Sequence, residues 1–207
     1  MNRPTRIPIF PLEMVLFPGT LLPLHIFEPR YRRMVHNCLE RRSEFGLVLA
    51  RDKGIATVGC TAEILEVTKR YDDGRMDILN LGRAVFRILQ VLEDDPLLEA
   101  EVDYHSADLD AAATPESVKL VELFEECHQL VFGKKAPQRD PALGGSLSFF
   151  VASELPLDLE FKQELLEAEN EAARVEALTE RVAVWIPQLR HLNRARQVAG
   201  GNGHPLM

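Results

Sequence analysis

Two short segments carry residue types that serve as nucleophiles in hydrolases. The segment Gly144-Gly145-Ser146-Leu147-Ser148 begins like the turn that presents a catalytic serine, but it lacks the final glycine of that motif. Cys127 and His128 are adjacent, and neighbouring residues on a helix point in different directions, which argues against a thiol–base pair. Each of these residues is more simply interpreted as part of the core or the surface.

The motifs that bind phosphates or metals are also missing. The chain contains no GxxxxGK[ST] and no GxGxxG, and its six histidines show neither HxxxH spacing nor a carboxylate at a metal-site spacing. Cys38, Cys60 and Cys127 are widely separated, without a CxxC pair. The sequence therefore predicts no catalytic residue, no metal site and no cofactor, although residues distant in sequence can meet in space.

The composition is that of a folded, acidic protein. The 207 residues are 46% hydrophobic and 27% charged, enough for one large domain or two small ones. The net charge of −8 gives no general attraction to nucleic acid or anionic lipid. Because the three cysteines occur without an export signal, we expect a reduced, cytoplasmic protein.

The chain opens with an apolar run from Ile7 to Phe27 whose only charged residue is Glu13. The run is long enough to span a membrane, but it is interrupted by Pro8, Pro11, Pro18, Gly19 and Pro23. Prolines inside a helix remove hydrogen bonds that lipid cannot replace, which argues against a membrane span. Short apolar runs bounded by Pro and Gly are typical of buried strands, and we expect strands at residues 7–10, 14–17 and 21–26.

The periodicity of the remaining sequence divides the chain into two parts. Residues 1–104 are rich in β patterns, with one helix at 28–42, strands at 45–50, 58–68, 76–81, 85–92 and 97–104, a turn at 71–75, and a bulge or bend at Gly82. In strand 58–68, Ala62, Ile64 and Val67 are expected to point inward.

The second part is helical. After a polar linker at 105–114, helices are predicted at 115–132, 147–155 and 159–168, followed by a long, heptad-like helix that Asn170 caps. Pro187 is expected to kink this last helix, and residues 199–207 to form a disordered tail. We therefore predict a β-rich unit at 1–104 and a helical bundle at 115–198.

A series of motifs in the first part resembles one known family. The motifs at the start of the chain are Pro11-Leu12, residues 15–19 (VLFPG), residues 22–24 (LPL) and residues 26–31 (IFEPRY). Further along, residues 58–64 resemble the family's VGTxAxI strand, 73–75 its hairpin turn, 82–88 its GxxRFxI strand and 162–167 its KQxLLE helix start. In this order they resemble the substrate-binding, amino-terminal domain of Lon proteases, and above all small bacterial proteins that consist of this domain alone.

The resemblance implies an α+β fold, with a PUA-like β-barrel followed by a helical bundle. It also implies a role in engaging polypeptide substrates without enzymatic activity, because a chain of 207 residues has no room for the ATPase and protease modules of Lon. One position departs from the family pattern, since Val85 stands where relatives often carry arginine.

The candidate partner-binding residues follow from the same opening segment. An apolar patch on a barrel can hold apolar side chains of a partner, and a barrel edge can accept a strand. The residues that we predict to contribute are Phe17, Leu21, Phe27, Arg30, Tyr31 and Arg33. The alternative for each aromatic or aliphatic residue in this set is a place in the barrel core.

Two other functions remain open from the sequence. PUA-like folds elsewhere bind RNA, and a basic patch for RNA is conceivable from Arg30, Arg33, Arg41, Arg42, Arg83 and Arg87, unless Glu28, Glu40 and Glu44 pair with them. A small enzyme or ligand pocket between barrel and bundle, involving Cys60 or His25, is the other alternative. The oligomeric state stays undecided, because the long helix can pack within the bundle or on a second chain.

Overall fold

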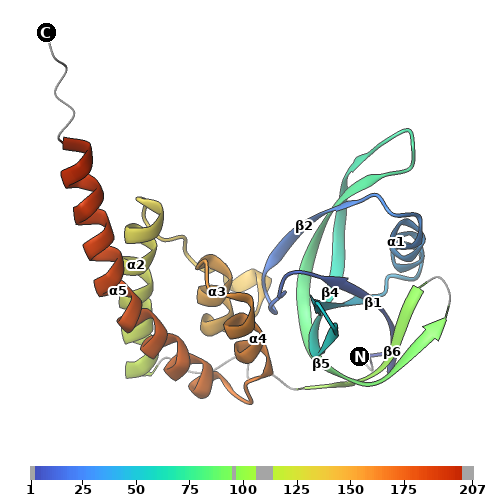
Figure 1. Ribbon diagram of the computed structural model, residues 1–207. Helices are drawn as coiled ribbons and strands as arrows, with labels where there is room; N and C mark the ends of the chain where they lie inside the picture. The colour runs from blue at the N-terminus through green and yellow to red at the C-terminus, as the bar shows by residue number, and fades with distance from the viewer. Residues whose placement is uncertain (1–2, 95–96, 106–113, 202–207) are drawn as a thin grey trace, which may run out of the picture.

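The computed structural model describes residues 3–94, 97–105 and 114–201. Figure 1 shows the β-sheet and the first helix at one end and the helices that follow residue 114 at the other. The strands are β1 (Arg6–Leu12), β2 (Leu21–Ile26), β3 (Phe45–Arg51), β4 (Gly54–Arg70), β5 (Met76–Asp94) and β6 (Leu97–Tyr104). The helices are α1 (Pro29–Arg41), α2 (Pro115–Phe132), α3 (Leu147–Glu154), α4 (Leu159–Glu167) and α5 (Glu171–Gly201), with a short 3₁₀ helix at Pro141–Leu143. The predicted α+β class, with strands preceding the bundle, is confirmed.

The six strands form one sheet that closes on itself. Their order is β2-β5-β4-β3-β1-β6, and β5 also pairs with β6. The first part of β5 (residues 76–81) pairs with β2, and the second part (residues 86–94) pairs with β6. Five strands therefore complete the barrel, while β2 extends the sheet beyond it and, within the described residues, has a strand on one side only.

The pairing pattern explains how a run so rich in proline can be extended. Residues 6–8 of β1 pair with β6, and residues 9–12 pair with β3. Among the residues that the structure describes, Pro8 and Pro11 thus lie where β1 has a neighbour on one side, and Pro23 lies in β2, which pairs with β5 alone. Proline is tolerated at such edge positions because its missing N–H has no ladder partner to lose.

The predicted strand at 14–17 is wrong. These residues form a loop between β1 and β2 in which Leu16 and Phe17 are buried, and the hydroxyl of Thr20 donates to the carbonyl of Phe17 at 2.7 Å. The segment is apolar because it packs between the barrel and the bundle. Burial on several sides produces the same continuous apolar run as a core strand.

Close backbone contacts hold this loop against both halves of the protein. Gly19 has a φ of +76°, and a Cβ atom there would lie 2.3 Å from the carbonyl oxygen of Gly144. A Cβ atom on Gly82 would lie 2.1 Å from the carbonyl oxygen of Phe17. The predicted irregularity at Gly82 is confirmed, because the pairing of β4 with β5 shifts between Cys60 and Ala62.

The other strands lie close to their predicted positions. The two strands expected at 76–81 and 85–92 are one long strand, β5, bent at the Gly82 bulge. Ala62 is buried, and Ile64 and Val67 both pack against the core although they are three residues apart. They share a face because the pairing of β4 with β5 shifts again after Ile64.

The helices begin and end largely where capping predicts. Thr114 and Ser117 form a reciprocal capping box at the start of α2, and the side chain of Asn170 accepts from the N–H of Ala173 at the start of α5. α5 continues through Pro187 to Gly201, three residues into the predicted tail. Residues 106–113 of the predicted linker (105–114) and residues 202–207 of the predicted tail lie outside the described residues.

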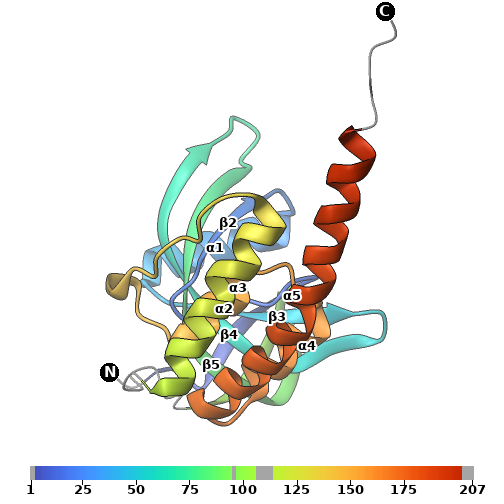
Figure 2. The ribbon, with the colours of Figure 1, turned by 90° about the vertical axis from the view of Figure 1, so that its left-hand side faces the viewer.

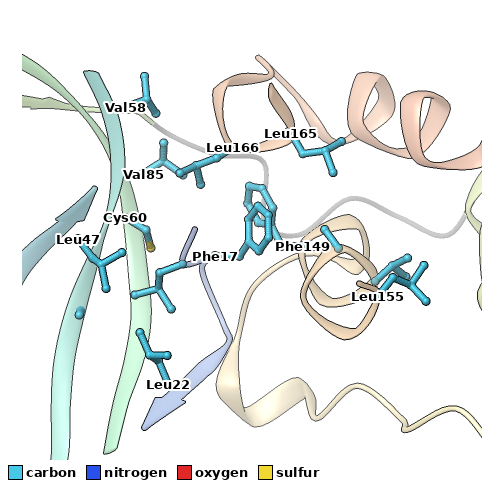
Figure 3. Packing of buried hydrophobic residues seen from close by; sticks show 14 of the residues in the cluster. Phe17, Leu22, Leu47, Val58, Cys60, Val85, Phe149, Leu155, Leu165 and Leu166 are labelled. Carbon is cyan, nitrogen blue, oxygen red and sulfur yellow. The ribbon is translucent and has the colours of Figure 1, made fainter. Parts of the chain in front are cut away.

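One hydrophobic core spans both parts of the chain. Phe17 from the β1–β2 loop stacks on Phe149 of α3, with ring centroids 5.3 Å apart (Figure 3). Figures 1 and 2 both show α2 beside α5, and Arg190 of α5 pairs with Glu126 of α2. Val175, Leu178 and Val182 are buried, so much of the heptad-like face of α5 packs within the bundle.

Candidate functional site

The outer face of β2 carries a row of exposed side chains. Alternate residues of a strand point to opposite faces, and in β2 the inward residues include Leu22 and Ile26, which are buried. The outward residues are Leu21, Pro23 and His25 within the strand and Phe27 immediately after it, and all four are exposed. We call these four residues the outer row. Leu21 is 46% exposed and Phe27 is 60% exposed. These are large exposed fractions for apolar side chains.

A hydrogen-bonded cluster fixes the Phe27 end of the outer row. The ring of His25 stacks on that of Phe27 with centroids 6.2 Å apart, and His25 Nδ1 lies 2.5 Å from Asp77 Oδ1. The hydroxyl of Tyr71 donates to Asp77 Oδ2 at 2.9 Å. Hydrogen bonds from His25 and then Tyr71 hold the pKa of Asp77 below its usual value. The carboxylate therefore anchors two rings beside Phe27.

A groove of about 390 Å³ lies at the other end of the outer row, where β2 begins. Its walls come from the β1–β2 loop and the start of β2 on one side, and from the α2–α3 connection, α3 and the start of α4 on the other. Apolar side chains in the lining include Met14, Val15, Leu21, Leu143 and Phe150. Lys162 also contributes, and burial lowers the pKa of its ammonium group. The groove thus continues the apolar surface from β2 toward the bundle.

The predicted arginines lie at the start of α1, directly after Phe27. Arg30 pairs with Glu28 through a 2.9 Å contact, and its guanidinium lies 4.5 Å from the centre of the Tyr31 ring. Arg33 is exposed one turn further along the same helix. Both arginines are exposed and follow Phe27 within the first two turns of α1.

Phe17 and Tyr31 lie in the core, as the alternative interpretation of these residues allowed. Phe17 is 1% exposed against Phe149, and Tyr31 is 7% exposed and stacks on Phe10 at 3.9 Å. Burial raises the pKa of the Tyr31 hydroxyl. Of the six predicted residues, the structure therefore brings Leu21, Phe27, Arg30 and Arg33 to the surface and leaves the other two beneath it.

The prediction from sequence did not include Tyr71, Asp77 or the lining of the groove from α3. Tyr71 is the first residue of the predicted turn at 71–75, and Asp77 lies just after that turn. Only the pairing of β2 with β5 brings the turn beside Phe27. Pro23 and His25 could have been found by extending the alternation from Leu21 to Phe27. Phe150 belongs to a helix more than 120 residues away, and no local pattern connects it to β2.

Two of the six arginines in the proposed basic patch pair with acidic side chains. Arg30 pairs with Glu28, as that alternative considered, and Arg83 pairs with Glu63. Glu40 instead pairs with His36, and Glu44 with Arg3. The remaining arginines of that set, Arg33, Arg41, Arg42 and Arg87, are exposed.

A second pocket, of about 270 Å³, lies between barrel and bundle. Val58, Val85 and Leu166 line it together with Arg87, His105 and the buried Arg174. Arg174 pairs with Glu171 at 3.0 Å and lies 4.2 Å from the centre of the Phe149 ring, so its charge is satisfied within the core. Neither Cys60 nor His25, the residues suggested for this location, lines the pocket.

The chemistry suggested for Cys60 finds no support in its surroundings. Cys60 is fully buried, and burial raises the pKa of its thiol far above the usual value, so the nucleophilic thiolate is suppressed. Within residues 3–94, 97–105 and 114–201, no three His, Cys, Asp or Glu side chains are grouped so as to hold a metal ion. No helix in the described part of the chain is both long and apolar enough to cross a bilayer.

Comparison with known proteins gives one consistent family. Residues 6–183 match the model of the ATP-dependent protease La (LON) substrate-binding domain. The Lon protease of Syntrophus aciditrophicus is 26% identical over 197 residues, covering 85% of this chain and 25% of that protein. The Lon protease of Parabacteroides distasonis is 31% identical over 105 residues, covering 46% of this chain and 13% of that protein. The chain thus spans a quarter or less of the length of these curated relatives.

Solved structures agree with this result. The crystal structure of a Lon N-terminal domain protein from Xanthomonas campestris is 28% identical with a TM-score of 0.69, covering 84% of this chain and 96% of that one. The N-terminal domain of the Mycobacterium avium complex Lon protease has a TM-score of 0.62 at 18% identity, covering 86% and 98%, and shows the fold alone. Because the family model covers most of its residues, this chain belongs to the Lon substrate-binding domain family.

Proposed function

We propose that this chain binds unfolded or extended polypeptide and that the outer row of β2 is the contact surface. The observation that carries the proposal is the exposure of Leu21 and Phe27 on one face of a single strand, in a domain of a substrate-binding family. Contiguous exposed apolar surface is characteristic of protein interaction sites. Phe27 supplies an aromatic anchor, and the groove beside Leu21 can accept an apolar side chain of the partner.

The arrangement supports binding without chemistry. The side chains that are fixed by hydrogen bonds near Phe27 are a histidine, a tyrosine and an aspartate, and they hold one another rather than a nucleophile. The apolar surface beside them suits partners that expose side chains normally buried in a folded protein. Arg30 and Arg33 follow Phe27 as exposed charges, and charges at the rim of an interface influence the rate of association more than the affinity.

The test is a binding measurement with a permanently unfolded protein, such as reduced and carboxymethylated lactalbumin. Burying a phenylalanine contributes about 1.5–3 kcal/mol, so Phe27→Asp should weaken binding about tenfold to a hundredfold, and Leu21→Asp should also weaken it. The affinities are measured by fluorescence anisotropy of the labelled probe.

The matched control is Leu89→Asp, which places the same charge at a side chain that is 66% exposed on the distant half of β5. It should leave the affinity unchanged, and all three variants should keep the unfolding midpoint of the wild type because their positions are exposed. Equal weakening by Leu89→Asp, or no binding by the wild type, would contradict the proposal.

A further inference from the structure

β2 leaves one edge of its backbone without a neighbouring strand. In the described part of the chain it pairs with β5 only, at residues 21–26. The direction of its peptide groups follows from two hydrogen bonds. The N–H of Gly82 donates to the carbonyl of Thr20 at 3.0 Å, and the side-chain amide of Asn80 donates to the carbonyl of Leu22 at 3.0 Å.

These two carbonyls point toward β5, so the nitrogen atoms that share their peptide planes point away from it. Those nitrogens belong to Leu21 and Pro23, and the period of two in a strand adds the N–H of His25. The free edge therefore presents the N–H groups of residues 21 and 25 as donors and the carbonyl groups of residues 21, 23 and 25 as acceptors. Pro23 leaves a gap in the row of donors because it has no N–H. Proline is tolerated at this position because its nitrogen points away from β5. At a neighbouring position, whose N–H points toward β5, proline would remove a hydrogen bond of the ladder.

The surroundings of the edge have room and the right chemistry for an added strand. The groove lined by Thr20, Leu21 and Leu22 lies beside the first residues of β2 and reaches the α2–α3 connection. Leu21 and Phe27 provide apolar contacts at the two ends of the outer row. The four residues of the row occupy every second position, which is the spacing of the side chains on one face of an extended chain. Several charged groups beside the row have partners within the chain: Arg30 pairs with Glu28, Arg75 pairs with Asp73, and Asp77 accepts a hydrogen bond from Tyr71. The exposed apolar side chains of the row itself favour an uncharged segment of the partner.

We propose that the polypeptide bound by this chain adds to the free edge of β2 as an extra strand, with uncharged, apolar residues facing the outer row. The inference rests on the proposed function and specifies its geometry: main-chain hydrogen bonds hold an extended segment while Leu21 and Phe27 select apolar side chains. Pro23 keeps the edge from forming a complete ladder, so that segments of many sequences bind reversibly and two copies of the chain do not pair permanently.

Backbone substitutions at the edge test the inference with the same unfolded probe. Pro23→Ala adds an outward N–H and should tighten binding about twofold to tenfold, the effect of one net hydrogen bond. His25→Pro removes an outward N–H and should bind the probe about twofold to tenfold more weakly than His25→Ala, which removes the same ring but keeps the N–H. Unfolding midpoints show which variants remain folded.

Hydrogen exchange gives a readout that needs no variant. Adding the probe should slow exchange of the amides of Leu21 and His25, while those of Leu22 and Leu24, which face β5, should change little. Strand addition is overturned, and side-chain binding stands, if the probe binds and Phe27→Asp weakens its binding without the edge behaving as expected. In that case the edge amides exchange as before, Pro23→Ala binds like the wild type, and His25→Pro binds like His25→Ala. If the wild type does not bind the probe, both proposals fail. The edge amides could also become protected without the probe, to a degree that rises with protein concentration. That result would mean that a second copy of the chain occupies the edge, and it would also overturn the inference.

Discussion

Burial controls the chemistry of the three cysteines. Cys38, Cys60 and Cys127 are all buried with free thiols. Burial raises the pKa of the Cys60 thiol strongly and that of Cys127 to about 11, with a smaller contribution from the charge of Glu126. A raised pKa keeps each thiol protonated at neutral pH, and the reactive thiolate appears only as the pH approaches the raised value or the chain unfolds.

We therefore predict that the folded protein at pH 8 reacts with a thiol-specific disulfide reagent far more slowly than free cysteine does. An ordinary thiol with a pKa of about 8.5 is partly ionised at that pH, whereas burial raises the pKa of all three thiols and so lowers their ionised fraction. Absorbance of the released chromophore measures the rate, and addition of denaturant should release all three thiols. Rapid labelling of Cys60 in the folded state would revive the nucleophile interpretation.

Residue type alone does not separate the contact side chains from the core. Phe17 and Phe27 belong to the same apolar run, yet one stacks on Phe149 and the other is exposed. The outward position of Phe27 could be predicted by counting alternate residues from Leu21. The burial of Phe17 could not, because its partner lies in a helix 132 residues further along the chain.

At the scale of elements, the Pro18-Gly19 turn joins the barrel to the bundle. Gly19 has a positive φ and packs directly on Gly144 and Gly145. Gly133, the C-cap of α2, also has a positive φ of +69° but faces open space. The two glycines therefore separate the effect of backbone conformation from that of close packing.

Gly133→Ala should lower the free energy of unfolding by about 1–2 kcal/mol, the effect of a left-handed conformation alone. Gly19→Ala should lower it by clearly more, because its Cβ atom would also overlap the Gly144 carbonyl. Urea unfolding followed by circular dichroism measures both values. An equal loss in the two variants would mean that the loop shifts freely and does not fix the barrel against the bundle.

Elements with a strong local signal were predicted well from the sequence. β2 and β6 match their predicted ranges, and Asn170 caps α5 as expected. The error at 14–17 has a physical cause, since an apolar segment buried by surrounding elements has the composition of a strand without its pairing. The single long β5 was divided in two because Gly82 bends it without ending it.

At the scale of the whole molecule, the core and the candidate site both depend on the meeting of barrel and bundle. The hydrophobic cluster runs from Phe10 in β1 to Ile186 in α5, so the strand-rich part and the helical part of the chain share one core. The groove beside β2 has one wall from each part. Family resemblance predicted this architecture, but only the three-dimensional structure places the α2–α3 connection and Phe150 next to Leu21.

The central claim is that polypeptide contacts the outer row of β2, and site-specific photo-crosslinking tests it most directly. A photoreactive phenylalanine analogue replaces Phe27 in one sample and Leu89, equally exposed on the far half of β5, in another, and each is irradiated with labelled, carboxymethylated lactalbumin. The account predicts strong crosslinking at position 27, competed by unlabelled probe, and little at position 89. Equal crosslinking at both positions, or crosslinking at position 89 alone, would contradict it.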